Sequence, residues 1–214
     1  MNKSSPIDIA VLISGSGSNL QALIDQQNTY GYRVVCVLSN KDNAYGLVRA
    51  QEAGIPTLVV DHLAYESRES FERAMITAID FYQPNLVVLA GFMRILTAVF
   101  ITHYHHRLLN IHPSLLPKFK GTHTHEKALA AHEIEHGASV HWVIPELDSG
   151  QVIAQASLMV MPDDTPETLA QRVLTLEHQL YPAVIAAIVQ GVVCAHNSLN
   201  RPFTLSQLLH KVVH

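Results

Sequence analysis

The stretch that decides the fold is IDIAVLISGSGSN, residues Ile7 to Asn19. Its first part, Ile7 to Ile13, is dominated by apolar and β-branched residues and predicts a buried strand. Gly15 and Gly17 follow at once, and a helical pattern begins at Ser18. A strand, a glycine turn and a helix in direct succession are typical of the first unit of a parallel α/β sheet.

The same alternation continues along the first half of the chain. Further strands are expected at residues 33–38, 57–60 and 86–90, and helices at residues 18–27, 45–53 and 67–82. Gly54 ends the second of these helices, and the third ends before Pro84. The pattern predicts an α/β fold with a Rossmann-like, mostly parallel twisted sheet flanked by helices.

The second half keeps part of this alternation of strands and helices. It predicts a short helix at residues 97–104, a strand at 108–112, a helix at 124–131, strands at 139–143 and 152–160, and a long helix at 166–190. Residues 197–214 carry an apolar stripe, Leu205, Leu208, Leu209 and Val212, which predicts a packed amphipathic helix. We expect one domain over residues 1–214, made of halves at 1–90 and 91–190 and a tail at 191–214.

Composition narrows the class of protein. The chain has 214 residues, of which 48% are hydrophobic and 15% charged, and this balance is typical of a compact globular protein. A formal charge of -4 lacks the basic character of a nucleic-acid-binding protein. The first residues resemble no secretory signal, and no apolar run is long enough to cross a membrane. Cys36 and Cys194 are expected to be buried free thiols, which favours a cytoplasmic protein. Together with the charge and the lack of a long apolar run, this predicts no nucleic-acid or membrane partner. The sequence leaves the oligomeric state open, a homodimer included.

The glycine loop predicts an anion site. Glycines between a strand and a helix let backbone amides curl around a phosphate at the helix N-terminus. Leu20 replaces the third glycine of a dinucleotide fingerprint, the second strand ends in Ser39 and Asn40 rather than an acid, and no Gly-Lys-Ser/Thr follows. The functional reading is therefore a single phosphomonoester. The alternative is a tight turn without a ligand.

A second motif, Asn110-Ile111-His112-Pro113-Ser114-Leu115-Leu116-Pro117, ends a predicted strand at a proline. Strand side chains alternate, so Asn110 and His112 point to the same side. An amide donor beside a proton-transfer group suits a reaction that builds negative charge on a carbonyl oxygen. Alternatively, Asn110 caps a turn and His112 is a satisfied core histidine.

Fourteen histidines raise the question of a metal site. His132 and His136 would share a helix face if that segment were helical. However, the chain has no His-Glu-x-x-His and no cysteine near a plausible ligand set, so we predict no metal. Most histidines are expected at the surface, and His123 is the one expected beside the active site.

The 110–117 motif, followed by Gly121 and by Glu146-Leu147-Asp148-Ser149-Gly150, resembles the folate-dependent formyltransferases. The resemblance implies the formyltransferase fold and transfer of formyl from the co-substrate 10-formyltetrahydrofolate to the amine of 5-phosphoribosylglycinamide, in purine (IMP) biosynthesis. It makes Asn110, His112 and Asp148 the catalytic residues. A carboxylate beside a histidine favours the charged imidazolium, which can stabilise an oxyanion.

The resemblance also assigns binding residues, with residues 1–90 as the phosphate-binding half and 91–190 as the folate-binding and catalytic half. The positions that match contacts to the glycinamide ribonucleotide are Gly17, Ser18, Asn19, Leu20, Gln21, Leu174 and Glu177. Those that match folate contacts are Arg68, Met93, Arg94, Ile95, Leu96, Asn110, Ile144 and Asp148. Without a ligand, Met93 and Leu96 would be plain core, and Arg68 and Glu177 solvated helix charges. The chain departs from the family at Leu174, where a polar residue is expected, and at Gln151, where proline is common.

Three rival functions remain. Formyltetrahydrofolate hydrolase shares the catalytic trio but normally adds an N-terminal regulatory domain, which is not expected in this chain of 214 residues. Methionyl-tRNA formyltransferase adds a C-terminal nucleic-acid-binding domain, which is not expected here. A noncatalytic phosphometabolite-binding module would keep the glycine loop but would have no need of Asn110, His112 and Asp148.

Overall fold

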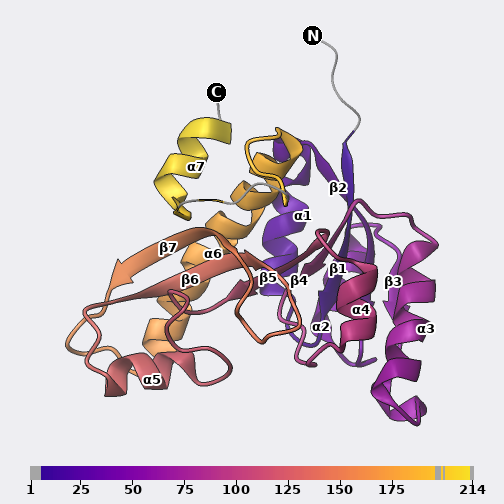
Figure 1. Ribbon diagram of the computed structural model, residues 1–214, viewed down its shortest axis with the longest axis horizontal. Coiled ribbons are helices and arrows are strands. Elements are labelled where there is room, and N and C mark those ends of the chain that lie inside the picture. The colour runs from indigo at the N-terminus through magenta and orange to yellow at the C-terminus, as the bar shows by residue number, and fades with distance from the viewer. Residues whose placement is uncertain (1–5, 196–198, 200, 213–214) are drawn as a thin grey trace. The chain divides into compact units, whose positions relative to one another are not determined.

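The computed structural model describes residues 6–195, 199 and 201–212 (Figure 1). Two compact units divide between Leu109 and Asn110. Both units combine strands with helices, and the predicted α/β class is confirmed. In the described part of the chain, no helix has the length and apolar character of a membrane span. That the whole chain behaves as one domain stays a prediction.

Unit 1 contains four strands that pair in parallel. They are β1 (Ile7–Ile13), β2 (Tyr32–Ser39), β3 (Thr57–Val59) and β4 (Leu86–Leu89), in the order β3-β2-β1-β4. Ile9 to Ile13 are fully buried because helices cover both faces of a parallel sheet. The chain runs outward from β1 to β3 and then returns to β4 on the other side of β1. In such sheets, ligands bind at the carboxyl ends of the strands where this reversal occurs.

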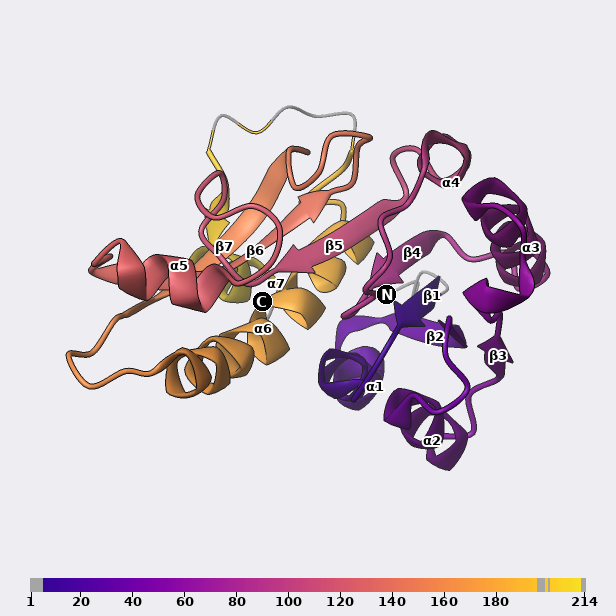
Figure 2. The same cartoon turned by 90° about the horizontal axis from the view of Figure 1, so that it is seen from below.

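The helices of unit 1 lie on both faces of its sheet. Figure 2 shows α1 (Ser18–Tyr30) and α2 (Tyr45–Glu52) on one face and α3 (Arg68–Asp80) on the other. The short helix α4 (Ala98–His103) packs against α3. A 3-10 turn, η1 (His62–Ala64), lies between β3 and α3. Right-handed crossovers explain this division, because the direction of travel across the sheet reverses after β3.

Unit 2 begins within β5 (Leu108–His112), which spans the unit boundary. The order continues through β6 (Glu135–Trp142), β7 (Val152–Met159) and the two-residue β8 (Phe203–Thr204). β6 and β7 are antiparallel, and β7 and β8 are parallel.

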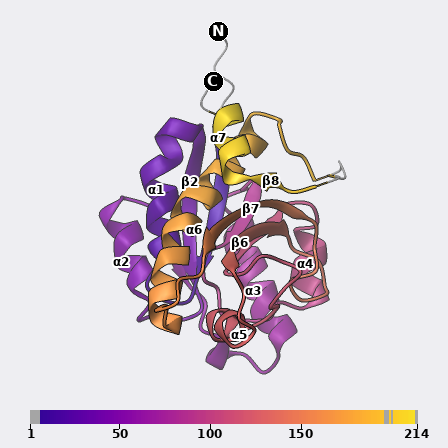
Figure 3. The same cartoon turned by 90° about the vertical axis from the view of Figure 1, so that its left-hand side faces the viewer.

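Three helices complete unit 2: α5 (Thr124–Ala130), α6 (Pro166–Val189) and α7 (Leu205–Val212). Figure 3 shows α6 lying along β6 and β7, and both α5 and α7 pack on it. Along α6, the apolar side chains Leu169, Val173, Leu180 and Val184 are fully buried. The apolar face of α6 therefore supplies much of the core of this unit.

Some element predictions were wrong at their edges. β6 begins at Glu135 rather than at residue 139, because its ladder with β7 starts at the pair Glu135 and Met159 and pairing overrides the polar start of the strand. β8 was not predicted, since two residues give no periodic signal. The tail helix is confirmed as α7, with Leu208 and Val212 buried. Positions 196–198, 200, 213 and 214 of the predicted tail lie outside the described residues.

Both cysteines are free, but only one is buried. Cys36 lies within β2, and burial raises the pKa of its thiol to about 12. Cys194 is exposed after the end of α6, so its predicted burial was wrong. The apolar run around Cys194 misled the prediction, because only Val193 of this run is buried and the next side chain, Cys194, is exposed.

Candidate active site

Strand β5 places an amide and an imidazole at the start of unit 2. His112 is 5% exposed, and its Nδ1 lies 3.5 Å from Oδ2 of Asp148. Asn110, half-buried two residues earlier, has its Nδ2 3.2 Å from Nε2 of His141. His141 Nε2 in turn lies 3.7 Å from Oδ1 of Asp148. The structure thus brings the three residues named from the sequence into one polar cluster, with His141 as a fourth member.

The loop between β6 and β7 holds the Asp148 carboxylate in place. Asp148 adopts the left-handed backbone conformation, with φ of 47°, which aspartate tolerates better than most residues. Its Oδ2 accepts a hydrogen bond from Gly121 N at 2.9 Å. At the end of this loop, a Cβ on Gly150 would lie 1.7 Å from the carbonyl oxygen of Trp142. Only glycine allows this close return to β6, which explains the glycine of the Asp-Ser-Gly sequence.

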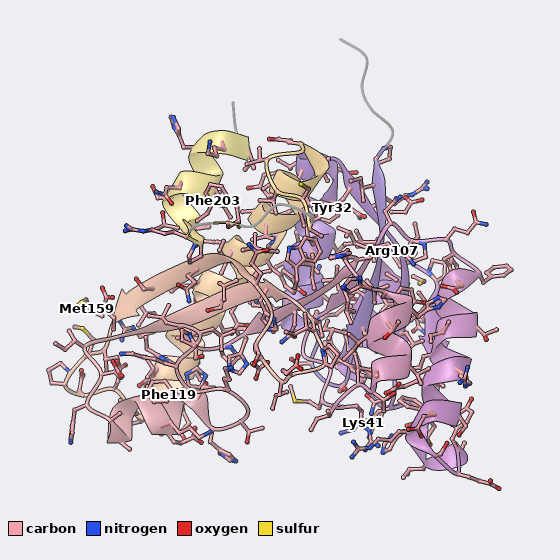
Figure 4. The ribbon with its side chains drawn as sticks, in the orientation of Figure 1. Tyr32, Lys41, Arg107, Phe119, Met159 and Phe203 are labelled. Atoms are coloured by element: carbon pink, nitrogen blue, oxygen red, sulfur yellow. The ribbon has the colours of Figure 1, made fainter. Side chains whose placement is uncertain are left out.

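The hydrogen bonds of His112 define how its ring is used. Its Nε2 lies 2.9 Å from the carbonyl oxygen of Phe119, which is labelled in Figure 4. A carbonyl oxygen only accepts, so Nε2 carries a hydrogen and donates it. Nδ1 faces the Asp148 carboxylate, another acceptor. Both ring nitrogens therefore face oxygen acceptors.

His141 was missed by the sequence analysis. It is 2% exposed, and its Nδ1 donates to its neighbour, the Trp142 carbonyl, at 2.9 Å. Burial lowers the pKa of His141, so the ring stays neutral and its Nε2 is free to accept from the Asn110 amide. One N–H of the Asn110 amide is thereby donated to His141, and this contact fixes the direction of the second N–H. The only signal in the sequence was its alternation with Ser139 in β6, which puts both on one side of the strand.

A buried clamp holds the turn that follows His112. Ser139 of β6 donates its hydroxyl to the Ser114 carbonyl at 2.6 Å and accepts from Leu116 N at 3.0 Å. Gln155 of β7 donates its Nε2 to the Leu116 carbonyl at 3.0 Å and to Ser139 Oγ at 2.9 Å. This network holds the proline-rich turn against β6 and β7. It therefore helps to position the segment that leads to Phe119, whose carbonyl faces His112.

Five of the seven histidines at positions 103, 105, 106, 123, 125, 132 and 136 are exposed, as predicted, whereas His125 is half-buried and His136 is buried. His132 and His136 share no helix, because α5 ends at Ala130 and His136 belongs to β6. His136 Nε2 instead lies 3.1 Å from Nδ1 of His125. His123 is exposed at the start of α5, with its Nδ1 3.2 Å from Oε1 of Glu126. Among the residues that the structure describes, no three histidine, cysteine or acidic side chains are grouped to hold a metal ion.

In unit 1, the glycine loop forms the N-terminus of α1. Gly17 is the N-cap residue with φ of 70°, and no side chain caps the helix. A Cβ on Gly17 would lie 2.5 Å from Cα of Gly46, so this glycine is also required for packing against α2. Arg49 of α2 donates its Nε to the Ser16 carbonyl at 2.9 Å. That contact turns the next peptide N–H to the opposite side and brings a cation to the loop.

The other loop residues divide by exposure. Ser18 and Gln21 are half-buried and Asn19 is buried. The side chain of Leu20 is fully buried, so only its backbone amide could meet a ligand. In unit 2, Leu174 and Glu177 are three residues apart on α6 and therefore share a face, with Leu174 half-buried and Glu177 7% exposed. Glu177 is therefore not the solvated helix charge of the alternative reading.

Four of the predicted folate residues of unit 1 follow β4, and the fifth, Arg68, begins α3. Met93 and Ile95 are 73% and 64% exposed, whereas Leu96 is buried. Met93 is thus not plain core. Arg94 and the exposed Arg68 line a cavity of about 200 Å³, together with His62, Tyr65, Glu66, Ser67 and Phe71. Besides Asn110, the predicted folate positions of unit 2 are the half-buried Ile144 and the buried Asp148, both in the loop after β6.

Comparison with known proteins places this geometry in a family. The family model described as "Formyl transferase" matches residues 7–185. The chain belongs to the formyl transferase family. It is 50% identical over 194 residues to phosphoribosylglycinamide formyltransferase of Escherichia coli (strain K12), covering 90% of this chain and 92% of that protein.

Two further relatives of this formyl transferase give its context. The solved structure of phosphoribosylglycinamide formyltransferase from Coxiella burnetii has a TM-score of 0.86 at 52% identity, covering 90% of this chain and 92% of the other. The trifunctional purine biosynthetic protein adenosine-3 of Drosophila melanogaster is 46% identical over 187 residues, which are 86% of this chain and 14% of that longer protein.

Replacing Asp148 by Asn should slow formyl transfer on the order of 10² in turnover, because it removes the charge that faces His112. Asn tolerates the left-handed backbone, and its carbonyl oxygen can still accept from Gly121 N, so the fold is expected to survive. Single-turnover formyl transfer and thermal unfolding measure the two effects. Ser149→Ala is the matched control, since Ser149 is exposed in the same loop. A near-normal rate in Asp148→Asn would refute the role of the carboxylate.

The His125–His136 pair predicts acid sensitivity. Burial lowers the pKa of His136 from the ordinary value of 6.5 to about 4, and burial also lowers the pKa of His125. Between these values the unfolded chain binds a proton that folded His136 rejects. The free energy of unfolding should therefore fall as the pH drops from 6.5 towards 4. Urea unfolding across this window should show a shallower fall in His136→Asn, and an unchanged slope in the exposed-histidine control His105→Asn. Equal slopes for His136→Asn and the wild type would contradict the prediction.

Proposed function

We propose that the chain transfers the formyl group of 10-formyltetrahydrofolate to the amine of 5-phosphoribosylglycinamide, giving the formylglycinamide ribonucleotide of purine biosynthesis. The observation that carries the proposal is His112 between the Asp148 carboxylate and the Phe119 carbonyl, with Asn110 on the same strand. A phosphometabolite-binding module would have no use for this buried polar cluster.

The proposed chemistry begins with the substrate amine. Its nitrogen attacks the formyl carbon, and the carbonyl electron pair moves onto oxygen. Asn110 donates its second N–H to this oxyanion while its first stays on His141. His112 donates from Nε2, because an oxyanion is a stronger acceptor than the neutral Phe119 carbonyl. Collapse of the intermediate breaks the bond to the folate nitrogen, which takes up the proton that the amine has lost.

The phosphosubstrate is proposed to use the glycine loop and α6. The uncapped N-terminus of α1 offers backbone amides to the phosphate, and Arg49 adds positive charge. Glu177, proposed to bind the glycinamide portion, brings a buried carboxylate suited to an amine. Leu174 supplies an apolar contact where relatives of this family are expected to have a polar one.

The formyl donor fits the residues after β4. A folate has an aromatic ring system and carboxylates, and the exposed Met93 and Ile95 side chains suit the ring. Arg68 and Arg94 bring cations to the cavity of about 200 Å³ beside them and suit a carboxylate. Ile144 and Asp148 are the proposed contacts from unit 2. A cytoplasmic location, where folate and nucleotide precursors occur together, is part of the proposal.

Purified chain supplied with both substrates should form the formylated ribonucleotide at an undiminished rate in excess chelator, because the proposed chemistry needs only an oxyanion site and a proton path. Product is measured by mass spectrometry and by the absorbance change of the folate. Release of formate without the amine would indicate a hydrolase, and binding without turnover would indicate a binding module. Activity lost in chelator and restored by zinc would contradict a metal-free reaction.

The glycine loop is best tested at Gly15. A Cβ there meets no atom within 4 Å, so Gly15→Ala keeps the fold and changes only the exposed surface of the loop. It should raise the KM for the phosphosubstrate about tenfold by hindering the approach of the phosphate, while the KM for the folate stays within about twofold. Gly17→Ala is the contrast: its Cβ would clash with Gly46, so it should lower the unfolding temperature. Equal KM changes for both substrates in Gly15→Ala would exclude the phosphate role.

A further inference from the structure

Ser14 occupies the junction between the two ligand segments proposed for unit 1. It directly follows β1 and directly precedes Gly15, and it is 6% exposed. Its backbone N–H donates to the Gly91 carbonyl at 3.2 Å, which ties it to the segment after β4. The proposed reaction uses no atom of Ser14, yet its hydroxyl is buried and has specific partners.

The hydroxyl links two strand ends in a defined direction. It donates to Oδ1 of Asn40 at 2.6 Å, and Asn40, which follows β2, is 1% exposed. Because that donation uses its only hydrogen, Ser14 Oγ acts as the acceptor for Met93 N at 2.8 Å. The amide of Met93, the hydroxyl and the Asn40 oxygen thus form one chain of hydrogen bonds, in which each bond strengthens the next.

The chain extends towards the cavity. Asn40 Nδ2 lies 3.4 Å from Nδ1 of His62, and His62 lines the same cavity as Arg68 and Arg94. Hydrogen bonds through Ser14 and Asn40 therefore connect the Met93 backbone with His62 at the cavity.

The far end of the segment is held in the same way. Glu72 of α3 is 1% exposed, and its two carboxylate oxygens accept from Thr97 N at 2.7 Å and from the Thr97 hydroxyl at 2.5 Å. Thr97 in turn caps α4. Buried side chains thus hold the backbone N–H groups of Met93 and Thr97 at the two ends of this segment. The side chains of Met93 and Ile95 nevertheless stay mostly exposed.

We propose that Ser14 is a positioning residue for the formyl donor: its hydroxyl holds the Met93–Leu96 backbone where it can bind the folate. Exposed apolar side chains on a backbone fixed by buried hydrogen bonds are pre-organised for a ligand, because little ordering remains to be done on binding. The inference rests on the proposed function, and it assigns to Ser14 an effect on the donor rather than on the phosphosubstrate.

Ser14→Ala removes the acceptor for Met93 N and the donor for Asn40. The KM for 10-formyltetrahydrofolate should rise about tenfold, because the Met93 amide loses its buried acceptor, while kcat and the KM for the phosphosubstrate stay within about twofold. Ser14→Thr keeps the oxygen and should recover most of the loss. Ser39→Ala is the matched control, because Ser39 is fully buried at the end of β2 and its hydroxyl accepts only from Lys41 N among the described contacts.

A second measurement does not depend on activity. Hydrogen exchange at the Met93 amide should accelerate in Ser14→Ala and stay at the wild-type rate in Ser39→Ala and Ser14→Thr. An unchanged Met93 rate, or faster exchange with an unchanged donor KM, would overturn the positioning role. Equal losses for both substrates would show a structural role only. If the wild type fails to transfer formyl at all, the proposed function fails, and the exchange rates still report whether the hydroxyl holds Met93.

Discussion

Buried polar groups at the carboxyl ends of strands must find hydrogen-bond partners inside the protein, because leaving one unpaired costs roughly 1–3 kcal/mol. This requirement determines the loops that carry the candidate site. In unit 1, Ser14 and Asn40 satisfy each other and bind the backbone after β4. In unit 2, Ser139 and Gln155 do the same for the turn after β5. Strand ends that would otherwise be free thereby become rigid supports.

The two histidines beside the Asp148 carboxylate have different roles, because different atoms face their rings. His141 is buried and donates Nδ1 to a main-chain carbonyl, so burial keeps it neutral and its other nitrogen accepts from Asn110. His112 has oxygen acceptors at both nitrogens. The neighbours of each ring, rather than its distance from Asp148, decide its state. His141 orients an amide, and His112 presents an N–H at Nε2.

Two departures from the family pattern have different weights. Trp142 N donates to the main-chain carbonyl of Gln151 at 3.0 Å. A proline at that position has the same carbonyl, so the substitution leaves this contact intact. Leu174 differs in kind, because it lies three residues from Glu177 on α6 and replaces a polar side chain on a face proposed to meet a ligand. The first change is neutral for the backbone, and the second alters the chemistry of a surface.

The sequence by itself determined the strand–glycine–helix unit at Ile7–Asn19, the alternating α/β order, and the placement of Asn110 and His112 on one side of a strand, because these follow from local periodicity and turn chemistry. Only the tertiary structure brought Asp148 to His112 across the β6–β7 loop, revealed His141, and joined Ser14 to Met93. These contacts join residues between 31 and 79 positions apart or depend on burial, and no local pattern encodes them. Gly17 shows the same limit: the sequence predicts a phosphate turn, and the structure adds a packing contact with Gly46 that only the folded unit creates.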